Sequence, residues 1–500
     1  MDFVTNIRIT TYFRNHIQTK TLFSKLALSV MLLFVFGISR ANNVQITGTS
    51  VTGSNITFTI SWENSWNANV APANWDAVWV FIKYQDCNTR IWAHAGLSTV
   101  GSDHTTSAPL QVDPVTDGKG VFIRRSSIGG GTVAPTQVTL KMAIPAGTYN
   151  YKVFGIEMVN VPQGNFELGD ATSVSTFNNI NVTATSQSAG ISAAAIGGGS
   201  STIPNTFPTG YNSFYCMKNE ISQLQYVEYL NSLTYDQQKA HTYSDPISAA
   251  GTYVMFGSFA YRNGIVISTP GSNGAIPAVY ACDASNGVEN NSDDGQSIAA
   301  NNLSWGDLAA YLDWAALRPM TELEFEKVCR GSMPRVAGEY PWGTTDINQV
   351  YSTLGGLIND YMSNETFTPV ANGTCVYGVG SGSGSFGPVR VGAFASGTSG
   401  RASSGAAFYG AMEMGGNLWE RVVNTSAAGV SFNGTNGDGT IAPNGDANQA
   451  TWPSVTTAAG SGFRGGDYIN VAARVRTSDR NTVTVADATR YPSYGGRGVR

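Results

Sequence analysis

Hydrophobic and polar residues alternate along the first third of the chain with the period of two that is typical of β-strands. The clearest examples are NITFTISW (55–62), AVWVFIKY (77–84), GVFIRR (120–125) and TYNYKVFGI (148–156). Pro, Gly, Asn and Asp residues separate these stretches, as they do in antiparallel sheets joined by turns. We therefore predict a β-sandwich over residues 42–150.

Five tryptophans fall within this predicted sandwich, namely Trp62, Trp66, Trp75, Trp79 and Trp92. Tryptophan is highly buried on average, so we expect these side chains to fill the core. The alternative interpretation is an exposed aromatic platform that binds a glycan.

After residue 150 the pattern becomes a few amphipathic helices embedded in loops and short strands. Three helices are predicted from capping boxes, in which a Ser or Thr at the N-cap is followed three residues later by a side chain that bonds back to it. The pairs are Ser222 with Gln225, Ser304 with Asp307, and Thr321 with Glu324. Glu322 and Glu326 lie near the start of the third helix, where the helix dipole favours carboxylates, so we expect structural rather than catalytic roles for them.

Two tracts of small residues, SAGISAAAIGGGSST (188–202) and GVGSGSGSFG (378–387), predict mobile surface loops. The whole chain is rich in Gly, Ser, Thr and Asn, and only 13% of its 500 residues are charged. This composition favours a loop-rich, mostly β protein that works outside the cytosol.

The N-terminus has the order of residues that a secretory signal requires. Basic residues lead into the largely apolar run LALSVMLLFVFGI (26–38), and Ser39-Arg40-Ala41 follows. We predict a signal peptide over residues 1–41, cleaved after Ala41, and therefore export to the periplasm, the cell surface or the medium. The alternative is an uncleaved anchor, but this run is short of the roughly 20 residues that span a bilayer. We expect no membrane insertion of the mature chain.

Removal of residues 1–41 takes away five basic residues and one acidic residue, so the mature chain would carry 24 basic and 33 acidic residues, a net charge of −9. This balance disfavours binding to nucleic acid or to anionic lipid.

Five cysteines remain after the predicted cleavage: Cys87, Cys216, Cys282, Cys329 and Cys375. None forms a CxxC pair, which argues against zinc-ribbon and thioredoxin-like sites. The odd count allows one or two disulfides in an oxidising compartment and leaves at least one thiol unpaired. We expect none of the five to be a nucleophile.

Eight ordered blocks in the second region resemble the formylglycine-generating enzymes of the sulfatase-modifying factor family. They are IEMVNVPQGNFELGD (156–170), FYCMKNEISQLQYVEYLNSL (214–233), LSWGDLAAYLDWAALRPMTELEFEKVCRG (303–331), EYPWG (339–343), GAMEMGGNLWERVVN (410–424), FRGGDYIN (463–470), RTSDRN (476–481) and GGRGVR (495–500). The resemblance implies a loop-rich, C-type-lectin-like domain over residues 151–500. The expected fold class is thus α+β, with an N-terminal β-sandwich followed by this domain.

The resemblance also implies the chemistry that such an enzyme needs, and the chain lacks it. Formylglycine-generating enzymes hold Cu(I) between two cysteines in a CxxxxC arrangement beyond the RGG block, and soft thiolates suit that ion. Here Cys375 is the last cysteine, and the nearest positions are Ala472 and Thr477. A related branch holds nonheme iron with histidines, but His241 is the one histidine after residue 150. We therefore expect neither copper nor iron.

The block GGNLWE matches the family's G-N-x-W-E motif, for which the resemblance implies a structural calcium ion. The residues concerned are Gly415, Gly416, Asn417, Leu418 and Glu420. Calcium takes six to eight oxygen ligands, which main-chain carbonyls of a glycine turn and one carboxylate would supply in part. The other interpretation is that Asn417 and Glu420 cap local backbone donors. Both interpretations stay open.

Arginines are concentrated in the C-terminal segment, which in this family lines the ligand-facing surface. Arg474, Arg476 and Arg480 are candidates for a ligand-binding cleft. Arg464 and Arg497 belong to blocks that lock the family's fold, so we expect structural roles for these two.

These observations together predict an exported, non-catalytic ligand-recognition protein on a formylglycine-generating-enzyme-like scaffold, with no catalytic residue assigned. Its partner would be a glycan, a peptide or a cell-surface molecule. One alternative is an enzyme of the same family with an unrecognised chemistry. Another is a structural component of a surface layer or filament.

Overall fold

The computed structural model describes residues 43–500, apart from 171–174, 286, 351–355, 368–370 and 380–385. The predicted signal peptide over 1–41 and most of the predicted loop 378–387 lie outside the described residues. Within the described part of the chain, no helix is both long enough and apolar enough to cross a membrane.

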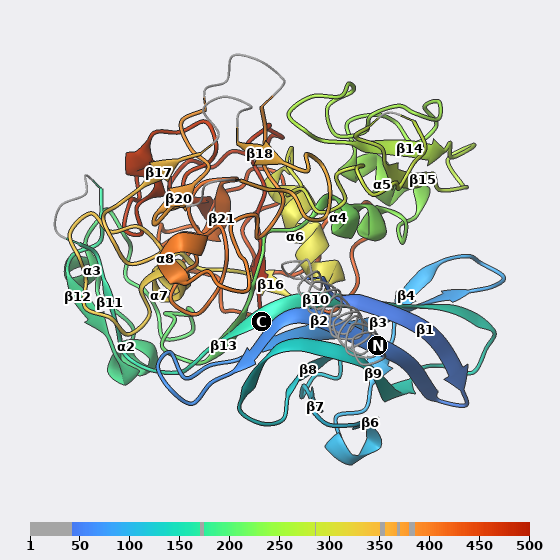
Figure 1. Ribbon diagram of the computed structural model, residues 1–500, viewed down its shortest axis with the longest axis horizontal. Coiled ribbons are helices and arrows are strands. Elements are labelled where there is room, and N and C mark those ends of the chain that lie inside the picture. The colour runs from blue at the N-terminus through green and yellow to red at the C-terminus, as the bar shows by residue number, and fades with distance from the viewer. Residues whose placement is uncertain (1–42, 171–174, 286, 351–355, 368–370, 380–385) are drawn as a thin grey trace, which may run out of the picture. The chain divides into compact units, whose positions relative to one another are not determined.

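Two facing sheets make up the N-terminal part, and both are shown in Figure 1. The first has five strands: β1 (Gln45–Thr52), β2 (Asn55–Asn67), β9 (Gly129–Ala143), β5 (Gly96–Leu97) and β6 (Thr105–Thr106). The second follows the order β16 (Arg318–Pro319), β23 (Gly498–Val499), β13 (Phe214–Met217), β10 (Tyr149–Val161), β3 (Asp76–Asp86), β8 (Val121–Arg125) and β7 (Leu110–Pro114), with β4 (Trp92–His94) also paired to β3. The four strands predicted from alternation correspond to β2, β3, β8 and β10.

The space between the two sheets is filled by the residues that alternation assigns to the inner faces. Ile56, Phe58 and Ile60 of β2 pack with Val78, Val80 and Ile82 of β3, and all six are buried. Burial of aliphatic side chains of this kind stabilises a fold by about 25 cal/mol per Å² of apolar surface. The sandwich is therefore held together chiefly by its apolar interior.

The other face of β3 and β10 is also covered, because the helices of the second region pack on it. Phe81 of β3 and Phe154 of β10 contact Trp314 at the end of α6 (Trp305–Trp314), with ring centroids 5.1 and 4.9 Å apart. Strand β3 is consequently buried from Asp76 to Lys83. A strand that is buried on both faces reads as a nearly continuous apolar run, as AVWVFI does.

Strand β10 belongs to both predicted domains. Residues 149–159 pair with β3, and its last residues, Met158–Val161, pair with β13. The predicted boundary at residue 150 thus falls at the start of a strand, and the sheet passes from one region to the other without a linker (Figure 1).

The three predicted helices are confirmed, including their caps. They are α4 (Gln223–Leu230), α6 and α7 (Glu322–Arg330), and in each the capping box predicted from sequence is complete. Each box satisfies backbone donors that a helix N-terminus would otherwise leave unpaired.

The remaining elements are short and joined by loops, so the chain is an α+β protein. They are η1 (Gly101–Asp103), β11 (Phe166–Leu168), β12 (Ile180–Val182), α2 (Ala184–Ala189), α3 (Ala193–Ile196), α5 (Tyr235–His241), β14 (Ile265–Thr269), β15 (Val279–Cys282), β17 (Asn348–Gln349), β18 (Leu357–Ile358), β19 (Thr366–Phe367), β20 (Thr374–Cys375), α8 (Arg401–Ser404), β21 (Glu420–Val423), β22 (Ser461–Arg464) and η2 (Ala472–Val475).

The tract 188–202 differs from the loop that its composition predicts. Helix α3 lies within it, capped by Ser192, and Ile191 and Ile196 are buried in the main core. Two isoleucines among small residues are enough to anchor the tract, because both point into the same apolar cluster. The composition of the tract hides this, since it counts residues without regard to which ones face inward.

Candidate functional site

The region that would hold the family's copper cysteines is a tightly packed polar interior. Thr477 is fully buried; its N–H donates to the Glu339 carbonyl at 3.0 Å, and its own carbonyl accepts from Arg464 Nη2 at 2.7 Å. Its hydroxyl oxygen is buried without a hydrogen-bond partner. Ala472 lies five residues earlier, half-buried in η2. Neither side chain is a ligand for a soft metal ion.

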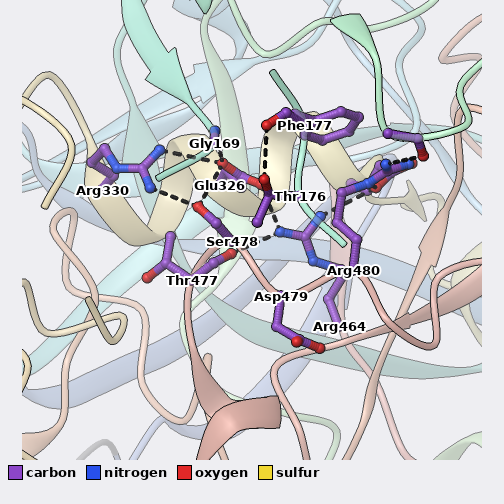
Figure 2. Close-up of polar contacts among 12 residues, drawn as sticks. Gly169, Thr176, Phe177, Glu326, Arg330, Arg464, Thr477, Ser478, Asp479 and Arg480 are labelled. Atoms are coloured by element: carbon purple, nitrogen blue, oxygen red, sulfur yellow. Dashed lines mark hydrogen bonds and ion pairs between the residues drawn. The ribbon is translucent and has the colours of Figure 1, made fainter. Parts of the chain in front are cut away.

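Five buried charged residues surround this position, and we refer to them as the Glu–Arg cluster. They are Glu322, Glu326, Arg330, Arg464 and Arg480. Arg464 lies between the two α7 carboxylates, 3.2 Å from Glu322 Oε2 and 2.8 Å from Glu326 Oε1. Figure 2 shows Arg330, Glu326 and Ser478 in mutual contact, with Thr477 beside them. The cluster therefore links α7 to the C-terminal segment.

The electrostatics of the cluster keep the Glu322 carboxylate ionised. Burial by itself raises the pKa of Glu322, but Arg480 and Arg464 outweigh burial, and the resulting pKa is lowered. Buried charges are tolerated when they are paired and hydrogen-bonded in this way. The prediction that Glu322 and Glu326 are structural agrees with these contacts.

The three arginines proposed for a ligand cleft occupy different environments. Arg480 is buried, donates to both oxygens of Glu322 at 2.6 and 2.9 Å, and lies 3.8 Å from the centroid of the Phe177 ring. Arg474 is half-buried and pairs with Asp479 at 3.2 Å. Arg476 is half-buried on the other side of Val475. The structure therefore places Arg480 in the interior and leaves Arg474 and Arg476 partly accessible.

The GGNLWE turn has a backbone that its residue types explain. Gly416 and Asn417 both have left-handed φ angles, +76° and +61°. A Cβ on Gly416 would lie 2.4 Å from Cys375 Sγ, so glycine is required on two grounds. Asn417 tolerates its conformation because it is among the residue types that adopt the left-handed region.

Side chains from distant segments hold this turn in place. The Asn417 side chain donates to Glu220 Oε2 at 2.5 Å and accepts from the Val389 N–H at 2.8 Å. The Leu418 N–H donates to Glu220 Oε1 at 3.0 Å. Glu420 pairs with Arg497, whose Nε lies 2.5 Å from Oε1. The structural role expected for Arg497 agrees with this buried ion pair.

Three buried glutamates lie around the turn. Glu220, Glu413 and Glu420 are all buried, and one oxygen each of Glu413 and Glu420 has no hydrogen-bond partner. Burial raises the pKa of Glu413 to about 7, and burial together with the charge of Glu420 raises the pKa of Glu220 well above its usual value. A bound cation would displace the proton that burial favours on Glu220, and carboxylate oxygens are ligands that a hard divalent ion accepts, so the residues present fit such an ion.

Main-chain oxygens would have to complete any such coordination. Among the described residues, no three His, Cys, Asp or Glu side chains are grouped as metal ligands. The Gly415 carbonyl already accepts a weak hydrogen bond from Cys375 Sγ at 3.2 Å. Whether calcium binds here stays a prediction.

Sequence reasoning did not identify Glu413 and Glu220 as parts of this region. Glu413 lies seven residues before Glu420 in the same block, so its proximity was a usable signal. Glu220 is about 200 residues away, and only the fold brings it to the turn.

The histidine of the second region is hydrogen-bonded, and Cys87 alone of the five cysteines is exposed. His241 uses both ring nitrogens, Nδ1 with Asp307 Oδ1 at 3.0 Å and Nε2 with the Gly445 carbonyl at 2.7 Å, so no serine occupies the place of a triad nucleophile. All five cysteines are free thiols, and four are buried. Burial raises the pKa of Cys216 to about 12 and also raises that of Cys375, which keeps both as thiols near neutral pH.

Comparison with known proteins bears on the second region. A comparison with curated proteins finds no match. The family model described as "Sulfatase-modifying factor enzyme 1-like domain" matches residues 150–500, from the start of β10 to the last residue of the chain. More than two thirds of the chain is covered by this match, and the blocks that carry the resemblance all lie inside it. The chain therefore belongs to the sulfatase-modifying factor family, which includes the formylglycine-generating enzymes.

Proposed function

We propose that this is an exported, non-catalytic ligand-recognition protein built on a formylglycine-generating-enzyme scaffold. One observation carries the non-catalytic part: no cysteine follows Cys375, and the threonine at the second copper position is packed inside the Glu–Arg cluster. Cu(I) in this family needs thiolates, and Thr477 offers a hydroxyl that is already enclosed.

The recognition part rests on the family's use of the C-terminal segment as its ligand-facing surface. Arg474 and Arg476 are partly accessible there and are the residues we assign to ligand contact. A glycan, a peptide or a cell-surface molecule would be the partner. Export rests on the basic, apolar and small-residue order of residues 1–41.

Metal analysis and oxygen uptake of the purified mature chain test the non-catalytic assignment. We expect neither stoichiometric copper nor iron, and no oxygen consumption when a cysteine-containing peptide is added. Stoichiometric copper together with oxygen uptake would overturn the proposal in favour of an oxidase. A protein that binds no glycan or peptide on arrays but polymerises would instead support the structural-component alternative.

We also propose that calcium binds at the GGNLWE turn through Glu420 and main-chain oxygens of the segment Gly415–Leu418. Two buried carboxylate oxygens without partners, on Glu413 and Glu420, support this. The ion would stabilise the turn and compensate the charge of the carboxylates around it. Its role would be structural and not catalytic.

Glu420→Gln tests the calcium site by chelator dependence of the thermal midpoint. The wild-type midpoint should fall when chelator is added, whereas the variant should have a lower midpoint that chelator does not change. Glu322→Gln is the matched control, because it also removes a buried charge from an arginine pair but lies in the Glu–Arg cluster, so it should keep the chelator response. If chelator changes the thermal midpoint of neither the wild type nor the variant, the calcium site is ruled out.

A further inference from the structure

A pocket of about 330 Å³ lies where the sandwich meets the second region. One wall is the end of β2 and the loop after it, including Trp66 and Asn74; the other is the segment from Ala395 to Met412. Neither wall makes the pocket alone. The pocket is also separate from the Glu–Arg cluster and from the GGNLWE turn, since no residue of either lines it.

The two walls are fixed to each other by hydrogen bonds and close packing. Trp66 Nε1 donates to Asn74 Oδ1 at 3.1 Å, and Asn74 Nδ2 donates in turn to the Tyr409 carbonyl at 2.9 Å. The Trp66 ring lies against Gly410, where a Cβ would come within 2.9 Å of the indole. The pocket is thus pre-formed, and a ligand would not have to order its walls.

The lining combines aromatic faces with small polar groups. Trp66 and Phe408 are half-buried, so part of each ring stays accessible, and Tyr409 packs edge-on against Phe408 at 5.0 Å. Ser396 and Ser399 supply hydroxyls at the rim, and Ser396 is exposed. Aromatic side chains with a few convergent polar groups are typical of small-molecule sites of roughly 300–1,000 Å³.

The charges that line the pocket are cationic. Lys218 and Arg401 are the charged residues among its lining, and no Asp or Glu is present there. Lys218 is balanced by Glu157 at 3.2 Å. Arg401 stacks 5.2 Å from the Phe408 centroid and donates to the Cys329 and Pro341 carbonyls, and among the described ion pairs no carboxylate partners it. A ligand with a positive charge would therefore be disfavoured.

We propose that this pocket binds a saccharide that carries no positive charge. A pyranose ring has an apolar C–H face, which packs on an aromatic ring, and a rim of hydroxyls, which hydrogen-bond to side chains such as Ser396 and Ser399. The volume fits one or two sugar rings. The inference rests on the proposed function of ligand recognition and adds to it a second contact site, separate from Arg474 and Arg476, with a stated ligand class.

The test uses the mature chain on an array of neutral, acidic and amino sugars, followed by calorimetric titration of the saccharides that bind. N-acetylglucosamine oligosaccharides and their deacetylated counterparts form a matched pair that differs by charge. We expect at least one neutral or acidic saccharide to bind and the deacetylated amino sugars not to bind. Binding only of the cationic sugars, or of no saccharide, would overturn the inference.

Two variants assign the binding to this pocket. Ser399→Trp fills the pocket from its rim, and Phe408→Ala removes an aromatic wall. Each should raise the dissociation constant of the saccharide at least about tenfold, as loss of a buried anchor does. Trp92→Ala is the control, because Trp92 is also half-buried but lines a different pocket. If Phe408→Ala fails to fold, Ser399→Trp alone decides, since the rim serine is part of no core.

The outcomes separate this inference from the proposed function. Saccharide binding that both pocket variants leave unchanged would remove the site while keeping a recognition protein. Hits on a peptide array without any saccharide would do the same. Copper-dependent oxidation would end the proposed function whether or not the pocket binds sugar.

Discussion

The sandwich and the loop-rich second region provide hydrogen-bond partners for their buried backbone groups in different ways. In the sandwich, β3 and β10 pair over eleven positions, so the sheet itself satisfies the backbone and the interior can be aliphatic. In the second region most elements are short, so many buried residues lie outside any strand or helix. A buried backbone group must nonetheless find a partner.

Buried arginines supply those partners in the second region. Arg464 donates to the Thr477 carbonyl and Arg497 to the Lys218 carbonyl, both buried and outside any strand, and each arginine also pairs with a glutamate. Loops of this kind are therefore fixed by a few charged side chains with several donors each, so a single substitution there should matter more than one in the sandwich.

The largest expected effect is that of Arg464→Ala. The change leaves Glu322 and Glu326 buried with fewer partners, and breaking a buried pair on one side costs about 3–5 kcal/mol. Urea unfolding would measure it. Arg335→Ala is the matched control, because its pair with Glu167 is part-exposed and should cost less than about 1 kcal/mol. Equal losses of unfolding free energy in Arg464→Ala and Arg335→Ala would show that the buried ion pairs do not fix the second region.

A somewhat smaller effect is expected from Ile123→Ala in the sandwich. Ile123 is fully buried, and truncation of a buried isoleucine to alanine costs about 2–5 kcal/mol, depending on how far the cavity closes. Ile128→Ala, at a side chain that is 63% exposed, should leave the urea midpoint nearly unchanged. A cost above that of Arg464→Ala would reverse the ranking of the two regions.

Acid should act on the second region through its ion pairs. Arg480 and Arg464 hold the pKa of Glu322 below its ordinary value despite burial, so the stability that Glu322 contributes is present above about pH 4.5 and is lost as pH falls through the lowered pKa. The difference in unfolding free energy between wild type and Glu322→Gln should shrink between pH 5 and pH 3. For Ile123→Ala, the difference in unfolding free energy from wild type should stay constant over the same pH range. If the two differences change with pH in the same way, the ion pairs of Glu322 are not the cause.

The smallest effect is expected from Arg474→Ala. Its pair with Asp479 is part-exposed, with 27% of the arginine side chain accessible, so the cost in unfolding free energy should stay below about 1 kcal/mol. Arg480→Ala, in the same segment, should cost several times more because it leaves Glu322 buried. Similar thermal midpoints for the two variants would show that burial does not separate these arginines.

What the sequence revealed depended on whether a signal was local. Strand alternation and capping boxes are set by neighbouring residues, so β2, β3, β8 and the caps of α4, α6 and α7 were predictable. The family blocks located the GGNLWE turn. Glu220 pairs with Asn417, and Arg480 pairs with Glu322. Each pair joins residues more than 150 positions apart, and no periodicity in the sequence indicates such a contact.

The same limit explains two features that the sequence does not show. The tract 188–202 was assigned to a loop because its composition conceals two buried isoleucines. Arg480 looked like Arg474 and Arg476 because all three lie within seven residues, and only the position of Phe177 and Glu322 distinguishes them. Contacts between distant segments decide both cases.

The shared strand β10 has a practical consequence for anyone who wants to work with the family domain alone. A gene fragment that starts at residue 150, where the family match begins, would encode β10 without β3. The strand edge that β3 normally covers would face water, and such an edge recruits further copies of itself. A usable fragment would have to bring its neighbouring strand along, and a hybrid protein with a different N-terminal module would need one that offers an equivalent strand in the same register.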